Sequence, residues 1–345
     1  MSALRVAVVT GRIGDLDPVR AGAALGRGLA DRAQVAVVPL AEGGLDLAVS
    51  LGALWDAEPD VPLVSPPRTP GFAAGSGVAR APDADRWLVR TPGSLLIGLR
   101  QPAAPAWAPD ASTADLAEWV ATQARPDDAR IVLDLTGITA HDGGAGLLAI
   151  AGDVLEGRDL VGIVADDELE LPATGIGGGL ARRAFAARLD IAEVLAADAA
   201  LAGRARALGA GLELAPGGGA AGGSGLAVLA SGGRLVTGTQ FCHSESGLER
   251  TLGVADVVLT GCTELSALDR GGPVVSAVAR WSEAAQRPCV LVTGGAGLAR
   301  RELRTLGIEA AHLLPEGVPV EAALEAVAAR FAAGWVSGAP LPHVN

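Results

Sequence analysis

The sequence contains no lysine and no tyrosine among its 345 residues, so all 27 basic residues are arginines. Any clamp on a phosphate or a carboxylate must therefore use an arginine guanidinium or backbone N–H groups. Only three cysteines occur, at positions 242, 262 and 289, and none has a C-x-x-C spacing. This argues against a disulfide framework and a thiolate zinc site, and it favours a reducing, cytoplasmic location.

Histidines and long apolar runs are also scarce. The four histidines show neither H-x-H nor H-x-x-x-H spacing, so we predict no metal site from them. No apolar run reaches the roughly 18–20 residues that span a bilayer, and the N-terminus resembles a first strand more than a signal peptide. The net charge of −12 would repel nucleic-acid phosphates and anionic lipid. We therefore expect neither nucleic acid nor a membrane as a partner.

Short apolar runs that end on Thr-Gly recur along the chain. They are RVAVVTG (5–11), RIVLDLTG (130–137), RLVTG (234–238), DVVLTG (256–261) and CVLVTG (289–294). Helical patterns lie between several of them, at 17–33, 273–286 and 320–335. Apolar strands that alternate with helices predict an α/β fold with parallel sheets, and a chain of this length predicts two domains. The carboxyl ends of parallel strands border the ligand crevice, which would place the Thr-Gly turns at a site; the alternative is that the glycines only turn the chain.

A proline-rich stretch at 57–110 breaks this pattern, and we read it as an irregular excursion or a crossing between domains.

The segment TGITAHDGGAGLLAI (136–150) places His141, Asp142 and three glycines between a strand and a helix. Glycines there let backbone N–H groups approach an anion closely, and a helix N-terminus adds partial positive charge. Asp142 would act as a base or hold a metal. The alternative is an aspartate that caps its own helix in a tight turn, with His141 a bystander.

Two further glycine-rich segments are candidate anion sites. GGGAAGG (217–223) precedes an apolar run and would form a second cradle of N–H groups, although a hinge explains it equally well. TGGAGLARREL (293–303) is more simply a strand–turn–helix unit. FCHSESGLE (241–249) carries adjacent Cys, His and Ser residues, which on a strand would point to opposite faces and could not act together.

Taken in order, six pieces of the chain resemble the bacterial glycerate kinase family. These are VPLAEGGLDLAVSLGAL (38–54), ASTADLAEWVATQA (111–124), RIVLDLTGITAHDGGAGLLAI (130–150), GIGGGLARRAFAARLDIAEV (175–194), LAPGGGAAGGSGLAVLA (214–230) and DVVLTG (256–261). The resemblance implies a Rossmann/flavodoxin-like parallel α/β domain built from both chain ends, residues 1–60 plus 255–345. A second α/β domain, residues 61–254, would be inserted into it.

The resemblance also implies a function, an ATP- and Mg²⁺-dependent phosphorylation of glycerate or a related small hydroxy acid in the cytoplasm, and it is compatible with a homodimer. No metal ligand is assigned. The catalytic residues it implies are Asp142 and Arg12. The substrate-binding residues it implies are Glu42, Gly43, Gly44, Ser112, Thr113 and His141. The phosphate-binding residues it implies are Gly143, Gly144, Gly146, Gly217, Gly218, Gly219, Gly222 and Gly223.

Several residues of the family pattern are replaced. The first loop reads Val9-Thr10-Gly11-Arg12-Ile13-Gly14, without the family's acid, hydroxyl and lysine, so Arg12 would replace the lysine. Leu45 replaces an acid, and His141 replaces an asparagine. Because phosphoryl transfer depends on cations that neutralise the transferred group, two readings follow. The protein is a divergent kinase, or it is a catalytically degenerate paralogue that binds a metabolite or acts as a regulator.

Overall fold

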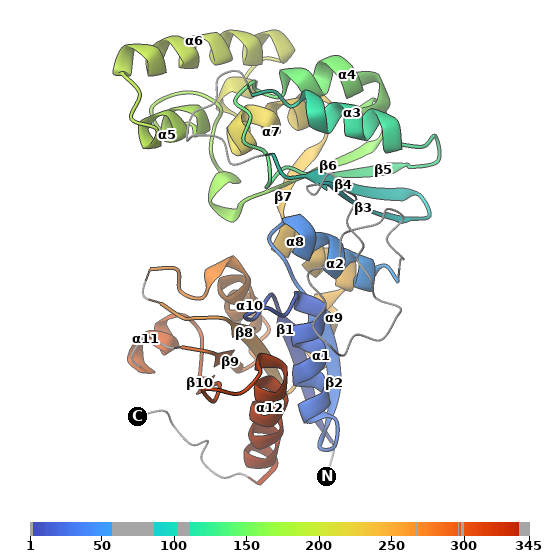
Figure 1. Ribbon diagram of the computed structural model, residues 1–345, viewed down its shortest axis with the longest axis vertical. Helices are drawn as coiled ribbons and strands as arrows, with labels where there is room; N and C mark the ends of the chain where they lie inside the picture. The colour runs from blue at the N-terminus through green and yellow to red at the C-terminus, as the bar shows by residue number, and fades with distance from the viewer. Residues whose placement is uncertain are drawn as a thin grey trace. The chain divides into compact units, whose positions relative to one another are not determined.

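The computed structural model describes residues 3–56, 86–101, 111–266, 268–295, 297 and 300–337 (Figure 1). The chain forms two compact α/β units. Unit 1 comprises Met1–Ala41, Val49–Trp55 and Thr239–Asn345, and unit 2 comprises Glu42–Ala48 and Asp56–Gly238. The predicted α/β class with two parallel-rich sheets is confirmed.

Unit 1 holds a five-stranded sheet in the order β10-β9-β8-β1-β2. Its strands are β1 (Leu4–Thr10), β2 (Ala33–Pro39), β8 (Val257–Cys262), β9 (Cys289–Thr293) and β10 (Ala310–Leu313). All the pairings are parallel. From β1 the chain moves outward to β2, whereas from β8 it moves the other way to β9 and β10. The strand order therefore reverses between β1 and β8, and a reversal of this kind opens a crevice at the strands' carboxyl ends.

One face of this sheet is covered by helices from opposite ends of the chain, α1 (Pro18–Leu29) and α12 (Val320–Ser337). Asp17 caps α1 by accepting a hydrogen bond from the Arg20 N–H, as the Asp-Pro start predicts. Phe331 of α12 is fully buried in the core that these helices share with the strands. Arg27 bonds to Glu321 and Glu325 at 2.6 Å each, at the exposed rim of this contact.

The opposite face carries α10 (Gly272–Ala284), which contacts β1, β8 and β9. Right-handed crossovers require this placement, since β1-to-β2 and β8-to-β9 run in opposite directions across the sheet. The remaining helices of the C-terminal part are α8 (Gly238–Ser246), α9 (Leu248–Val254) and α11 (Arg300–Thr305). Helix α2 (Gly44–Leu54) contributes residues to both units.

Unit 2 holds a second five-stranded sheet in the order β3-β4-β5-β6-β7. Its strands are β3 (Arg86–Thr91), β4 (Ser94–Leu99), β5 (Arg130–Asp134), β6 (Asp159–Val164) and β7 (Arg234–Thr237). β3 and β4 form an antiparallel hairpin, and the other pairings are parallel. The carboxyl ends of β4, β5, β6 and β7 therefore lie along one edge of the sheet.

The helices of unit 2 follow the strands in turn. They are α3 (Ala114–Gln123), α4 (Ala145–Leu155), α5 (Gly179–Ala186), α6 (Ile191–Leu208) and α7 (Ala220–Ala230), with short 3₁₀ turns η1 (Asp166–Glu168) and η2 (Leu212–Leu214). α3, α4 and α7 share one core with the sheet, in which Leu116, Leu147 and Val228 are fully buried. The loops that precede these three helices carry most of the predicted site residues.

Two local predictions are wrong. Residues 86–99, inside the proline-rich stretch, form the β3–β4 hairpin because two short apolar runs, WLV and LLI, pair across a Pro-Gly turn. Residues 57–85 and 102–110 lie outside the described part. Residues 241–246, read as a strand, belong to helix α8. Within the described residues, no helix has the length and apolarity that a membrane crossing requires.

Candidate functional site

The Asp142 carboxylate lies where the loops after β4 and β5 meet. Its Oδ2 accepts hydrogen bonds from Ser112 Oγ (3.0 Å), Thr113 N (2.8 Å), Thr113 Oγ1 (2.9 Å) and Gly146 N (3.1 Å). Its Oδ1 accepts from Gly144 N at 2.9 Å. Asp142 therefore joins the N-termini of α3 and α4, which is the capping alternative drawn from the sequence, extended to a second helix.

These contacts set the electrostatics of Asp142. Burial by itself raises the pKa of the carboxyl, but hydrogen bonds from the N–H groups of Thr113 and Gly146 and from the two hydroxyls outweigh it, and the pKa of Asp142 lies below its ordinary value. The ionised carboxylate is thus a weak base with its oxygens engaged. In this structure the group organises the loops around it.

The neighbouring site residues are held by the same network. Thr113 is buried and accepts a bond from Leu147 N at 2.9 Å, which fixes the start of α4 to that of α3. Gln101 is buried and its Oε1 accepts from Thr139 N and Ala140 N, while its Nε2 donates to Ser112 O. His141 is buried beside Asp142. Sequence reasoning missed Gln101, since a lone glutamine after a strand carries no signal of its own.

The glycine loop at the start of α7 packs against the same loops. Ala221, Gly222 and Gly223 all have left-handed φ angles, 50°, 65° and 89°. A Cβ at Gly222 would lie 1.7 Å from the carbonyl oxygen of Ala140. The segment is buried throughout, and Gly222 O accepts a long bond from Gly143 N at 3.4 Å. These glycines therefore make room for protein backbone, and their predicted role toward phosphate stays a prediction.

Gly217, Gly218 and Gly219 serve the same packing. A Cβ at Gly219 would lie 2.2 Å from Pro172 O, and one at Gly217 would lie 2.5 Å from the Leu235 side chain. The N–H of Gly218 donates to Ala215 O.

Glu168 anchors the loop from outside. Its Oε2 accepts from Ala221 N at 2.8 Å, and its Oε1 pairs with Arg183 Nη2 at 2.8 Å. Sequence reasoning missed Glu168 because the acidic run 166–168 looks like a solvated surface; its one signal is its place directly after an apolar strand.

A second acid that sequence reasoning missed, Asp134, holds the segment after β2. Asp134 is fully buried at the end of β5 and accepts hydrogen bonds from Gly44 N (2.6 Å), Thr136 N (3.0 Å) and Thr136 Oγ1 (2.7 Å). Burial raises the pKa of Asp134, against the lowering effect of these bonds. A Cβ at Gly43 would lie 2.1 Å from Thr136 Oγ1. The signal in the sequence was a lone acid within the apolar run IVLDL.

Glu42 lies beside this contact, among other acids. Its pKa is raised, first by desolvation and then by the charges of Asp166, Asp46 and Asp167. Repulsion of this kind is relieved by a cation. Within the described residues, however, no group of three or more His, Cys, Asp or Glu side chains is placed to hold a metal by itself.

Arg12 belongs to unit 1, at the reversal between β1 and β8. It is exposed, in the loop that follows β1. This loop is tied to the loop after β8 by a 2.8 Å bond from Gly14 N to Thr263 Oγ1. Thr10 Oγ1 lies 3.3 Å from Gly261 O, so the Thr-Gly ends of β1 and β8 do meet at one edge.

The structure thus brings Asp142, Ser112, Thr113 and the glycines of both loops together within unit 2, with Glu42–Gly44 held by Asp134 and Thr136 in the same unit. Arg12 lies in the other unit. These features define an α/β protein of two units, with the predicted site residues in loops at the carboxyl ends of both sheets.

Comparison with known proteins agrees with this class. Residues 181–333 match the model of the glycerate kinase family. The crystal structure of "putative glycerate kinase 2" from Salmonella typhimurium LT2 superposes with a TM-score of 0.72 over 98% of this chain and 99% of that chain, at 18% sequence identity. The family match relates residues 181–333 to the glycerate kinase family, and the likeness to the solved structure shows a shared fold.

Uncharacterized proteins of Mycobacterium bovis and Mycobacterium tuberculosis are each 31% identical to the chain over 224 residues. The alignment covers 62% of this chain and 58% of each relative. The match therefore spans less than two thirds of these relatives.

Proposed function

We propose that the protein transfers a phosphoryl group from ATP to glycerate or a related small hydroxy acid. The observation that carries the proposal is the family match over residues 181–333, which include the glycine loop before α7 and the strand ends of β8 and β9. The family and fold support a kinase-like function. The particular substrate and the use of ATP are our proposal.

Arg12 is the cation we assign to the transferred phosphoryl group. It follows β1 at the point where the strand order reverses, which is where ligands of open parallel sheets bind. The chain has no lysine to serve instead. A guanidinium forms two parallel hydrogen bonds with phosphate oxygens and stays charged at any working pH.

Mg²⁺ would arrive with the nucleotide. Such an ion is bound by one or two carboxylates together with the phosphates, and this suits a structure whose described acids form no complete metal cluster. The carboxylates near Glu42 fit that role, because burial and then the charges of the neighbouring acids raise the pKa of Glu42, and a cation would offset both effects. When bound, Mg²⁺ would neutralise phosphate charge; Glu42 and Asp166 would hold it.

In this proposal Asp142 is a positioning residue that does not take part in proton transfer. By holding the N–H groups of Thr113, Gly144 and Gly146, it fixes the turn that carries the predicted substrate and phosphate residues. The proton of the attacking hydroxyl is not assigned to Asp142, since its depressed pKa makes it a poor acceptor.

The experiment is an ADP-release assay with ATP, Mg²⁺ and D-glycerate, comparing the wild type with Arg12→Gln. Loss of one group that stabilises transition-state charge costs about 100- to 1,000-fold in kcat, so we expect that loss for Arg12→Gln and a partial rescue by Arg12→Lys. Arg32→Gln removes another exposed charge from the same unit and should leave turnover unchanged.

A wild type that releases no ADP with glycerate or other small hydroxy acids would refute the proposal. ATP·Mg²⁺ should also raise the melting temperature, because a ligand that binds only the folded state stabilises it.

A further inference from the structure

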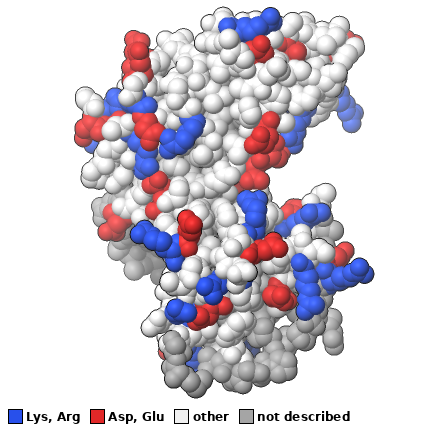
Figure 2. Space-filling view, turned by 180° about the vertical axis from the view of Figure 1, so that it is seen from behind, with Lys and Arg blue, Asp and Glu red and all other residues white. Residues whose placement is uncertain are grey.

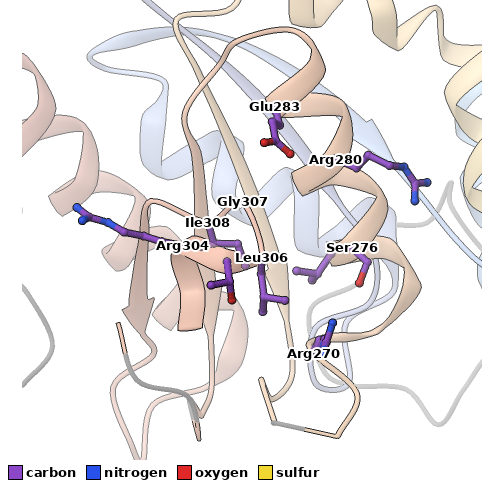
Figure 3. A pocket seen from close by; sticks show the side chains of 10 residues that line it. Arg270, Ser276, Arg280, Glu283, Arg304, Leu306, Gly307 and Ile308 are labelled. Atoms are coloured by element: carbon purple, nitrogen blue, oxygen red, sulfur yellow. The ribbon is translucent and has the colours of Figure 1, made fainter. Parts of the chain in front are cut away.

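A groove of about 240 Å³ lies on unit 1 between α10 and the segment that leads from α11 into β10 (Figure 3). One wall is formed by Val275, Ser276, Arg280 and Glu283 of α10, and the other by residues 304–308. Arg270 closes one end, below Ser276 in the view of Figure 3. None of these residues belongs to the site assigned above.

The end of the short helix α11 forms one side of the groove. Gly307, with φ of 77°, ends α11; its N–H donates to Arg304 O, and the Ile308 N–H donates to Leu303 O. This arrangement satisfies carbonyls that would otherwise present negative charge at a helix C-terminus. A Cβ at Gly307 would lie 3.6 Å from the Ala279 Cβ, so the turn packs closely against α10.

The groove carries more arginines than acids, in a chain whose net charge is negative. Acids outnumber arginines by 39 to 27 in the chain, and some arginines pair with them, as Arg183 does with Glu168. On the face seen in Figure 2, blue and red groups often lie beside one another. Arg270, Arg280 and Arg304 form no side-chain hydrogen bond or ion pair within the described residues, and Glu283 is the one acid among the lining residues.

The acid next to Arg270 is turned elsewhere. Asp269 accepts hydrogen bonds from Ser266 Oγ (2.8 Å) and Gly271 N (3.1 Å), which lower its pKa. In Figure 3 the side chains of Arg280 and Arg304 extend outward from the two opposite walls. Both are long and exposed, so they can fold over a ligand seated between them.

We propose that this groove binds a small phosphate ester. Three arginines whose side chains have no partner among the described residues offer forked donors that match phosphate oxygens, and Ser276 adds a hydroxyl. Leu306 provides partly exposed apolar surface for a short carbon skeleton, above the buried side chains of Val275 and Ile308. The volume lies below the roughly 300–1,000 Å³ of pockets for drug-sized ligands, which favours a metabolite of a few carbon atoms over a nucleotide.

Isothermal titration with glycerol 3-phosphate, with glycerol as the uncharged match, tests the proposal. The double variant Arg280→Gln/Arg304→Gln should weaken binding at least tenfold. The control Arg32→Gln/Arg301→Gln removes two exposed charges from the same unit, one of them from α11 itself, and should change the affinity by less than twofold. Binding should strengthen from pH 5.5 to 7.5, as the phosphate takes its second negative charge with a pKa of about 6.

Circular dichroism and the melting temperature of each variant show whether it folds, and Arg270→Gln gives a second test if the double variant does not. Arg12→Gln should bind glycerol 3-phosphate as the wild type does, which separates this site from the proposed catalytic edge. The proposal is overturned if the wild type does not bind the ester, if both double variants lose affinity equally, or if only Arg12→Gln loses it.

Discussion

At the scale of single residues, Asp142 stabilises the fold through its charge. Asp142→Asn replaces an acceptor oxygen by a donor facing Thr113 N and Gly146 N. Hydrogen bonds to charged groups contribute about 1.5–3 kcal/mol, so we expect a loss of about 2 kcal/mol in urea unfolding at pH 7. Asp115→Asn, an exposed acid in the first turn of α3, should cost less than about 1 kcal/mol.

The pH dependence of that loss has a defined sign. Because the folded pKa of Asp142 is depressed, its contribution is present in full above the unfolded value of about 3.9 and is lost as the pH falls through the folded value. The difference between wild type and Asp142→Asn should therefore shrink below pH 4. A difference that stays constant between pH 7 and pH 3 would contradict this assignment.

Two adjacent acids offer a matched comparison of a partly buried and an exposed ion pair. Glu168 pairs with Arg183, with side-chain exposures of 17% and 23%, and also holds Ala221 N. Asp167 pairs with Arg182, at 64% and 52% exposure. We expect Glu168→Ala to cost about 2–3 kcal/mol, since it strands a guanidinium and a backbone N–H, and Asp167→Ala to cost at most about 1 kcal/mol.

Chemical denaturation of both variants measures this difference. Equal costs would show that the carboxylate of Glu168 does not hold the glycine loop.

At the scale of elements, two glycines of unit 2 should respond in opposite directions to alanine. Gly222 has a φ of 65° and faces Ala140 O, so Gly222→Ala should prevent folding or cost several kcal/mol. Gly152 lies inside α4 with no atom within 4 Å of an added Cβ, so Gly152→Ala should stabilise by about 0.5–1 kcal/mol. The melting temperatures of the two variants measure these effects. If Gly222→Ala melts at the same temperature as the wild type, the loop does not pack as described.

The same elements show what the sequence could predict. Strands that end on Thr-Gly and helices with apolar periodicity were predicted correctly for α1, α10 and α12, because period and capping are local properties. The atoms that the glycines face were not predictable. A glycine is required wherever backbone approaches closely, and the pattern is the same whether the approaching atom belongs to a ligand or to Ala140.

For the acidic residues too, the sequence predicted local structure but not the partners that tertiary packing supplies. The spacing of Asp142 and its glycines predicted a turn before a helix. It did not predict that Ser112 and Thr113, from another loop, would donate hydrogen bonds to the carboxylate. Asp134 and Glu168 acquire their partners only through tertiary packing. An isolated acid inside an apolar strand, as in IVLDL, is a local sequence signal for a buried carboxylate that holds another segment of the chain.

At the scale of the whole molecule, each sheet closes its own core. Phe331 of α12, near the C-terminus, is buried against α1 and the strands of unit 1, while Leu147 of α4 is buried in the core of unit 2. Truncation of a buried Phe to Ala costs about 3–5 kcal/mol and of a buried Leu about 2–5 kcal/mol. These costs should fall on the unit that holds the residue, because cooperative opening follows contiguous packed cores.

Hydrogen exchange read by mass spectrometry distinguishes the two cores. Phe331→Ala should accelerate exchange in peptides that contain β1, β8 and β9 and leave those of β5 and β6 unchanged, whereas Leu147→Ala should do the reverse. The exchange of β1 is the sharper measurement, since this strand lies more than 300 residues from Phe331 in sequence and is linked to it only through the fold. If either variant accelerates exchange equally in both sheets, the chain opens as a single cooperative body, and the division into two folding units is wrong.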